Sequence, residues 1–160
     1  MVTIRDFTGA DAIAFHAINA AWIGSLFRLE PHDEAVLGNP QANILDRGGV
    51  ILMAELPDQG VVGTGALMPD GRGGVELTKM GVTDAAQGRG VGRALLTALI
   101  ERSTSLHAAP LYLLTNRRCA AAIHLYEQAG FQHDADVMAA RGAVYARCDV
   151  AMRWRLQTAG

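Results

Sequence analysis

The sequence contains little cysteine: only Cys119 and Cys148 occur among its 160 residues. The two are too far apart for a C-x-x-C pair, which argues against a zinc knuckle and against a dithiol redox motif. None of the five histidines has a metal-ligand partner four residues along a predicted helix. The sequence therefore predicts no metal site.

Long hydrophobic runs are also missing. No stretch approaches the ~18 uninterrupted apolar residues of a membrane-spanning helix, and the opening residues, MVTIRDFTG, lack the apolar core of a signal peptide. We therefore expect a cytoplasmic protein with both thiols reduced. The net charge of −2 gives no indication of a nucleic-acid partner or a membrane-surface partner.

Lysine is almost absent, because Lys79 is the single lysine among 14 basic residues. Half of the residues are hydrophobic, which is ordinary for a globular protein, and 160 residues suffice for one well-buried core. No repeat, linker or low-complexity tract divides the chain. We therefore expect a single domain over residues 1–160.

Hydrophobic patterning predicts an alternation of strands and helices. Apolar runs bounded by glycine and proline predict strands over residues 2–7, 48–56, 60–69, 73–83, 110–115 and 143–156. Helical spacing predicts helices over residues 11–27, 91–105 and 120–130, and a further short helix is expected between Pro31 and Pro40. The stretch ADVMAA, residues 135–140, is ambiguous. Because several strands follow one another before the first long crossover, we expect an α/β (α+β) fold: a mixed, mostly antiparallel central sheet of six to seven strands, flanked by about four helices.

Three glycines and two arginines fall within six residues at the start of the predicted helix 91–105. The first N–H groups of a helix lack partners within the helix and carry partial positive charge, so they attract phosphate groups. Glycines let such a group approach the backbone closely. The sequence predicts an anionic cofactor here, bound by Gln87, Gly88, Arg89, Gly90, Val91, Gly92 and Arg93.

Two common phosphate-binding motifs do not fit this segment. A Walker loop needs a lysine that is absent, and G-x-G-x-x-G fails whether it is counted from Gly88 or from Gly90. Q-x-x-G-x-G does fit, and AIHLYEQAGF follows at residues 122–131. Together these motifs resemble the coenzyme A pyrophosphate loop and the second signature, A-I-x-L-Y-x-x-x-G-F, of the GNAT superfamily of acetyl-CoA-dependent N-acetyltransferases, with a likeness to its small stand-alone bacterial members.

The resemblance implies two catalytic residues. Glu76 stands where the family often has a base that takes a proton from the substrate amine, and burial on an apolar strand would raise its pKa towards the required range. Tyr126 stands where the family has an acid that protonates the departing coenzyme A thiolate. Each also has a plain structural interpretation. Glu76 could be a solvated strand residue or bind substrate charge, and Tyr126 could be a core tyrosine.

The resemblance also implies how the cofactor arm lies. Strand 73–83 would separate from strand 110–115, and the pantetheine arm would occupy the gap, contacting the backbone of Met80, Gly81 and Val82. Asn116, at the end of YLLTN, could bind pantetheine or substrate, or could simply form a turn. Family members commonly have asparagine seven places before the signature tyrosine, but this chain has Cys119, a poor hydrogen-bonding replacement.

These features predict an enzyme that moves an acetyl group from acetyl-CoA to a primary amine by direct attack in a ternary complex. Net charge near zero favours a small-molecule acceptor, with a protein lysine or N-terminal amine as the alternative. A non-catalytic acyl-CoA-binding sensor is a second alternative. A dinucleotide-dependent oxidoreductase is disfavoured by the missing fingerprint. The long last strand would suit a homodimer.

Overall fold

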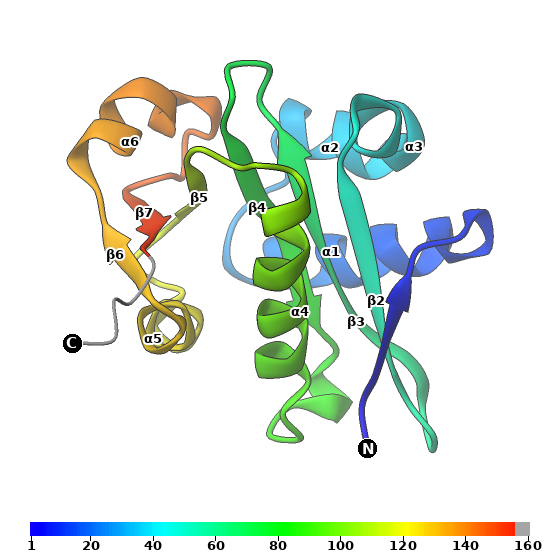
Figure 1. The fold of residues 1–160 in the computed structure, drawn as a ribbon. Coiled ribbons are helices and arrows are strands. Elements are labelled where there is room, and N and C mark those ends of the chain that lie inside the picture. The colour runs from blue at the N-terminus through cyan, green and yellow to red at the C-terminus, as the bar shows by residue number, and fades with distance from the viewer. Residues whose placement is uncertain (156–160) are drawn as a thin grey trace.

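The computed structural model describes residues 1–155, which form one seven-stranded sheet with helices on both faces (Figure 1). The strand order is β1-β2-β3-β4-β5-β7-β6, and every neighbouring pair is antiparallel except β4 and β5. The predicted mixed, mostly antiparallel sheet is therefore confirmed. The strands are β1 (Thr3–Asp6), β2 (Val50–Leu56), β3 (Gly60–Pro69), β4 (Val75–Val82), β5 (Leu111–Thr115), β6 (Phe131–His133) and β7 (Val150–Trp154).

Within residues 1–155, six α-helices accompany the sheet, where the sequence predicted about four. They are α1 (Ala12–Leu26), α2 (Pro31–Gly38), α3 (Pro40–Asn43), α4 (Val91–Ser105), α5 (Ala120–Ala129) and α6 (Ala135–Arg141). The short helix expected between Pro31 and Pro40 is confirmed as α2, and Pro40 starts the separate short helix α3 directly after Asn39. The ambiguous ADVMAA stretch is helical, and the Asp134 side chain caps it by accepting a hydrogen bond from the Val137 amide.

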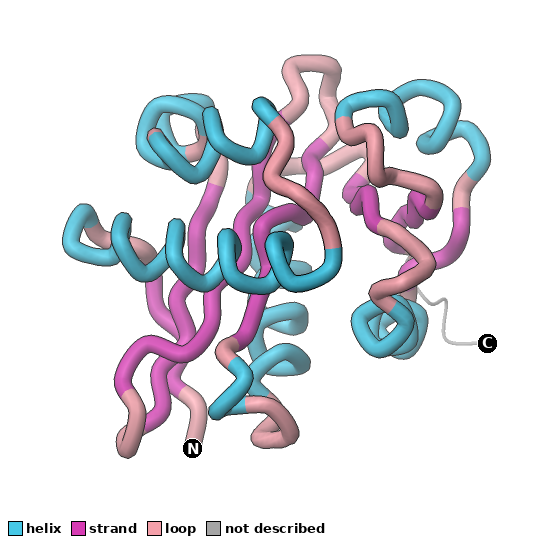
Figure 2. The backbone as a smooth tube through the Cα atoms, turned by 180° about the vertical axis from the view of Figure 1, so that it is seen from behind, coloured by secondary structure: helices cyan, strands magenta, loops and turns pink. Residues whose placement is uncertain are grey.

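The helices divide between the two faces of the sheet. α4 lies in front of the sheet in Figure 1, and α1, α2 and α3 lie behind it, where Figure 2 shows them from their own side. β2 shows the consequence in its sequence, VILMAEL: Leu52 packs into the core beneath α4, while Ile51 and Met53 pack into the core beneath α1 and α2. A strand covered on both faces reads as a continuous apolar run.

The two parallel strands, β4 and β5, pair only briefly. Val75 faces Leu111 and Glu76 faces Tyr112, and no further pair follows. Beyond this point β4 contains a bulge against β3, where Lys79 adopts the left-handed backbone conformation at φ +52°. The predicted separation of these two strands is therefore confirmed, and it opens the sheet towards the carboxyl ends of β4 and β5.

The predicted strand over residues 143–156 is wrong over its first half. Residues 142–144 form a short 3-10 turn, strand β7 begins only at Val150, and residue 156 lies outside the described residues. Two side chains from this segment, Tyr145 and Arg147, turn into the protein and bond to charged groups on other elements. Such long-range contacts cannot be read from the alternating apolar pattern that predicted the strand.

Candidate active site

The turn before α4 presents a row of backbone amides. Gly88 and Gly90 both adopt φ +79°, a conformation that glycine reaches without strain, and Gly90 leads directly into the helix. Among the described residues, no backbone or side-chain group accepts a hydrogen bond from any amide between Gly88 and Arg93. Several N–H donors thus converge at the positive end of α4, the arrangement that binds phosphate groups.

A cavity of about 400 Å³ opens at this end of the sheet. Its walls come from the end of β4, the turn before α4 and the first half of α5. Most of the predicted cofactor residues line it, together with the predicted acid Tyr126: Met80, Gly81, Val82, Gln87, Gly88, Gly90, Val91 and Gly92. The structure therefore brings together residues that are up to 46 positions apart in the chain.

Two residues of the predicted cofactor turn, Arg89 and Arg93, do not line this cavity. The Arg89 guanidinium forms an ion pair with Asp58 at 2.9 Å, and Arg93 donates to the Gln128 side chain at 3.1 Å. Both arginines are exposed at the rim of the turn. Their positive charge lies near the free amides, but their side chains point towards other surface groups.

Gly81 is required by close packing rather than by its backbone angles. A Cβ at this position would overlap the indole ring of Trp22 on α1. Trp22 is itself held in place, because its indole N–H donates to the Asn19 side chain at 2.9 Å. Glycine therefore lets α1 approach β4 closely enough for Trp22 to form part of the cavity wall.

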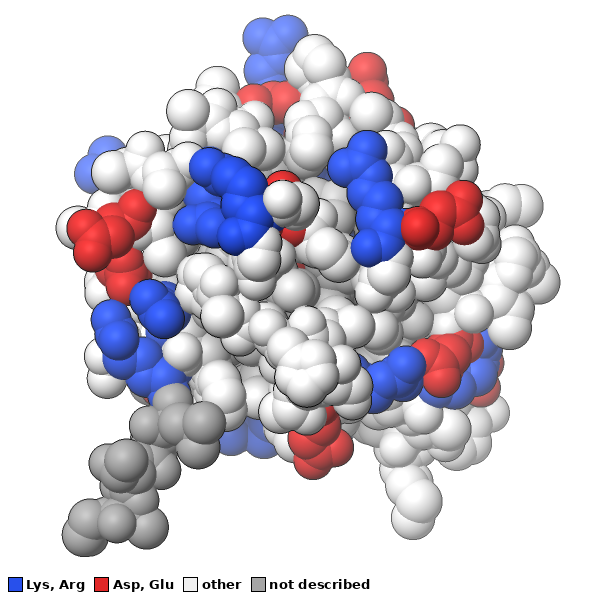
Figure 3. All heavy atoms as spheres, turned by 45° about the horizontal axis from the view of Figure 1, so that its top comes forward, with Lys and Arg blue, Asp and Glu red and all other residues white. Residues whose placement is uncertain are grey.

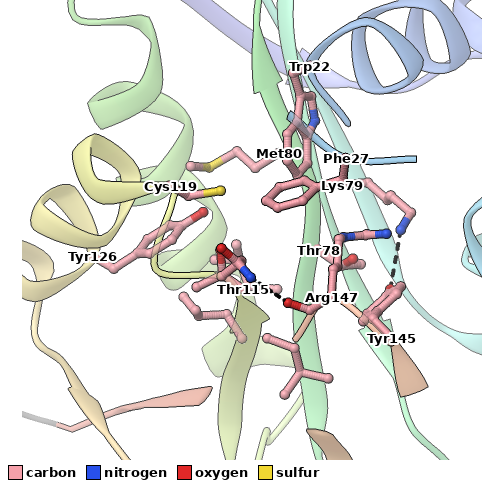
Figure 4. A pocket seen from close by; sticks show the side chains of 14 residues that line it. Trp22, Phe27, Thr78, Lys79, Met80, Thr115, Cys119, Tyr126, Tyr145 and Arg147 are labelled. Carbon is pink, nitrogen blue, oxygen red and sulfur yellow. Dashed lines mark hydrogen bonds between the residues drawn. The ribbon is translucent and has the colours of Figure 1, made fainter. Parts of the chain in front are cut away.

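A smaller cavity of about 40 Å³ adjoins the first, in the opening between β4 and β5 (Figure 4). This volume has room for about one or two water molecules. Trp22, Met80, Cys119 and Tyr126 line both cavities, so the two adjoin at these residues. Polar and aromatic side chains from the far side complete the smaller one: Phe27, Thr78, Lys79, Asn116, Tyr145 and Arg147.

Tyr126 lies where the two cavities meet. The residue is only 8% exposed, its ring packs edge-on against Phe131, and its hydroxyl points towards the cavity near Cys119 in Figure 4. Burial raises the pKa of the Tyr126 phenol above its usual value. The hydroxyl is therefore protonated at neutral pH and available as a hydrogen-bond donor.

Glu76 lies deeper than the sequence suggests. It is 4% exposed and lines neither cavity, although its strand position predicts a cleft or a sheet edge. Tyr145, which does line the smaller cavity, lies over the carboxylate, with its hydroxyl 3.4 Å from Oε2 of Glu76. The predicted rise in pKa is confirmed, because burial raises the pKa of Glu76 to about 7.

A group of buried charges beside Glu76 is absent from the sequence-based predictions. The Lys79 ammonium lies 2.7 Å from Asp33 on α2, and Arg147 binds both oxygens of the same carboxylate, at 2.6 and 2.8 Å. Burial opposes ionisation of Asp33, but the hydrogen bonds and charges of Arg147 and Lys79 outweigh it and lower the pKa of Asp33. Burial also lowers the pKa of Lys79, with Asp33 offsetting part of the change. Asp33 is therefore an anion shared by two cations.

The bulge in β4 explains how Lys79 reaches this group. Along a regular strand, alternation would place Lys79 on the same face as Leu77, beneath α4. The left-handed backbone at Lys79 instead turns the side chain towards α2, and Met80 packs against the α4 core. A solitary lysine in the apolar strand VELTKMGV was the one sequence signal that could have indicated this cluster.

Asn116 lines the smaller cavity, but its side chain is already engaged. Its amide nitrogen donates to the Arg147 carbonyl at 2.7 Å, and its amide oxygen accepts from the Arg118 backbone at 2.9 Å. These bonds correspond to the turn-forming interpretation of Asn116. They also hold the segment that carries Tyr145 and Arg147 against the end of β5.

Across the described residues, no helix has the length and apolar character needed to span a bilayer. Within residues 1–155, the structure brings no three histidine, cysteine or acidic side chains together as a metal-binding group. Basic and acidic side chains are interspersed on the face shown in Figure 3, with no broad patch of one sign.

Comparisons with known proteins agree with this geometry. A family model described as an acetyltransferase (GNAT) domain matches residues 47–133, more than half of the chain. A GNAT-family acetyltransferase of Staphylococcus aureus Mu50 superposes with a TM-score of 0.83 at 19% identity, covering 98% of this chain and 100% of its own. A search of curated proteins found no match.

Two further solved structures are more similar in sequence. One is yncA of Salmonella typhimurium with its cofactor acetyl-CoA, at 26% identity and a TM-score of 0.70, covering 96% of this chain and 91% of its own. The other is a ribosomal-protein-alanine N-acetyltransferase of Brucella melitensis, at 28% identity and a TM-score of 0.71, covering 96% and 99%. With the family model, the shared fold and the amide-lined turn in agreement, this chain belongs to the GNAT family of acetyltransferases.

Proposed function

We propose that this protein transfers the acetyl group of acetyl-CoA to a primary amine by direct attack within a ternary complex. The observation that carries the proposal is the row of unbonded amides from Gly88 to Arg93, which faces a cavity that continues to Tyr126. The diphosphate of coenzyme A is the anion that suits these donors. The acetyl-CoA bound to yncA, at 26% identity, supports the same choice of cosubstrate.

The backbone of β4 would hold the arm of the cosubstrate. Met80, Gly81 and Val82 lie beyond the last pair between β4 and β5, so their main-chain groups on that side have no strand partner. An extended arm can add there as an extra strand. One of these N–H groups would also stabilise negative charge on the thioester oxygen during attack.

Tyr126 would supply the proton that the departing thiolate needs. It is protonated at neutral pH, and its hydroxyl faces the junction between the cofactor cavity and the smaller cavity. Glu76 would accept the proton lost by the amine, because a carboxyl with a pKa near 7 exchanges protons readily at neutral pH. Alkylammonium groups have a pKa of ~10, so attack requires such a base.

The acceptor would enter from the side of Phe27 and Arg147. These two residues line the smaller cavity and also a neighbouring open cavity of about 570 Å³. A space of this size suits a small amine. The second candidate acceptor is a protein amine, which is favoured by the 28% identity to a ribosomal-protein-alanine N-acetyltransferase.

The remaining features fit a cytoplasmic enzyme with one domain. Cys119 and Cys148 are unpaired thiols in the structure, as expected in a reducing compartment. A homodimer stays part of the proposal, but it would not form by edge-to-edge pairing of the last strands. β7 is bonded to β5 on one side and to β6 on the other, so its edges are not free to pair with a second copy.

Two measurements test this function. Thermal shift with acetyl-CoA, ATP and NADH should show stabilisation by acetyl-CoA alone, following RT ln(1 + [L]/Kd). Thiol release from acetyl-CoA should then be followed against amino acids, polyamines, aminoglycosides and peptides with free N-termini. Stabilisation by NADH without acetyl-CoA would contradict the proposal. Tight binding of acetyl-CoA with no thiol release on any amine would favour the non-catalytic sensor.

A further inference from the structure

Tyr145 is fixed in place by its flanking residues. The backbone amide of Ala146 donates to the Glu30 carboxylate at 2.7 Å, and the Arg147 carbonyl accepts from Asn116 at 2.7 Å. Tyr145 itself is 4% exposed, and the His32 ring packs against it edge-on with centroids 5.2 Å apart. The segment between α6 and β7 therefore presents the Tyr145 side chain to the interior, beside Arg147.

The hydroxyl of Tyr145 joins two groups of different charge. It donates to Oε2 of Glu76 at 3.4 Å and accepts from the Lys79 ammonium at 3.2 Å (Figure 4 marks the second bond). A hydroxyl has one donor and two lone pairs, so one lone pair remains after these bonds. Tyr145 lines the smaller cavity and Glu76 does not. Tyr145 and Thr78 are the residues of that cavity whose hydroxyls bond to Glu76, and Tyr145 is the one that also bonds to Lys79.

We propose that Tyr145 relays the proton from the acceptor ammonium to Glu76, an inference that depends on the acetyl transfer proposed above. The ammonium N–H donates to the free lone pair of the Tyr145 oxygen. As that proton moves to the oxygen, the original phenolic proton moves to Oε2 of Glu76. Tyr145 ends neutral, Glu76 ends protonated, and the neutral amine attacks the thioester carbon.

The cations around the relay set its direction. Lys79 occupies one lone pair of the Tyr145 oxygen, which leaves the phenolic proton directed at Glu76. Lys79 and Arg147 carry positive charge near Glu76, and Asp33 holds both cations in position. Positive charge beside the phenol also stabilises negative charge that develops on its oxygen during the transfer. The bond to Glu76 is long, as catalytic hydrogen bonds often are before substrate binds.

Tyr145→Phe tests the relay because it removes the hydroxyl and keeps the ring. Thiol release should be measured from pH 5.5 to 9 with an acceptor on which the wild type is active. We expect kcat to fall about 10²-fold at pH 7, with the Kd for acetyl-CoA and the acceptor KM within about threefold of the wild type. We also expect the loss to shrink at high pH, where the acceptor is already neutral.

Tyr112→Phe is the matched control. Tyr112 faces Glu76 across the β4–β5 pair, but its hydroxyl bonds to Asp70 at 3.2 Å and it lines neither cavity of the site. The control should keep the wild-type rate and pH profile. Equal rates and pH profiles for Tyr145→Phe and the wild type would overturn the relay. The relay would also be overturned if Thr78→Val lowered kcat and Tyr145→Phe did not, because Thr78 carries another hydroxyl of the smaller cavity.

The result also separates the relay from the proposed function. A wild type that binds acetyl-CoA and acetylates no amine overturns the enzyme assignment and the relay together, whereas an active Tyr145→Phe overturns the relay alone. Infrared titration of the Glu76 carboxyl needs no turnover, with Glu76→Gln identifying the band. Tyr145→Phe should raise the pKa of Glu76 from about 7, because the carboxylate loses a donor. An unchanged pKa would contradict the hydrogen bond on which the relay depends.

Discussion

The ammonium of Lys79 lies 2.7 Å from the carboxylate of Asp33, and the side chains of the two are 2% and 0% exposed. Asp33 also binds Arg147, so its removal leaves two buried cations facing each other. We expect Asp33→Asn to lower the free energy of unfolding by about 3–5 kcal/mol, as measured by urea denaturation at pH 7. Asp58→Asn, which breaks the exposed pair with Arg89, should have no measurable effect. Equal stabilities for the two variants would contradict the role of Asp33 as the buried anion that binds both Lys79 and Arg147.

The raised pKa of Glu76 makes stability fall as pH rises. Because the folded pKa is about 7 and the ordinary value is 4.5, the folded state holds an extra proton between these pH values. Relative to the wild type, Glu76→Gln should therefore gain stability from pH 4.5 to 8, by up to about 3 kcal/mol. The measurement is the difference in unfolding free energy between the two proteins across this range. A difference that stays constant with pH would contradict the raised pKa.

Gly90→Ala should weaken acetyl-CoA binding about tenfold or more. An alanine at φ +79° is strained by about 1–2 kcal/mol, and relief of that strain would reorient the amides of the turn. Gly71→Ala is the control, because Gly71 has φ +77° and an equally open surrounding in the β3–β4 turn. Thermal unfolding should show similar losses of stability for both variants, and calorimetric titration with acetyl-CoA should show a loss of affinity only for Gly90→Ala. If Gly90→Ala bound acetyl-CoA as tightly as Gly71→Ala does, the result would argue against the turn as the diphosphate site.

Tyr126→Phe should slow thiol release without abolishing it. A thiol with a pKa of ~8.5 leaves fairly well without an acid, so we expect kcat to fall about 10-fold to 10²-fold. The acceptor KM and the affinity for acetyl-CoA should change little, because the ring packing against Phe131 is kept. An unchanged kcat at all pH values would assign Tyr126 to the core alone.

Local patterns predicted most of the elements and the cofactor turn. The free amides at Gly88 and Gly90 follow from glycines placed directly before an amphipathic helix, a signal contained within a few residues. The separation of β4 from β5 and the position of Tyr126 came from the family resemblance and agree with the structure. Only the turn depends on residues close together in the sequence; the other two features join segments that are 30 or more positions apart and needed the resemblance.

The buried charges beside Glu76 depend on contacts between distant segments. Asp33 meets Lys79 across 46 positions and Arg147 across 114. A bulge reverses the direction of Lys79, and a pattern of alternation cannot reveal it. The apolar parity of residues 143–156 likewise predicted a strand, but the bonds of Ala146 and Arg147 to Glu30 hold the first half as a loop.

The most direct test of the account is an NMR titration of the backbone amides with coenzyme A and with pantetheine, which lacks the diphosphate. We expect coenzyme A to shift the amide signals of Gly88, Gly90, Val91 and Gly92 strongly, and pantetheine to leave them nearly unchanged while it shifts Met80 and Val82. If coenzyme A bound tightly and left the amides from Gly88 to Arg93 unperturbed, the assignment of this turn as the diphosphate site would be wrong.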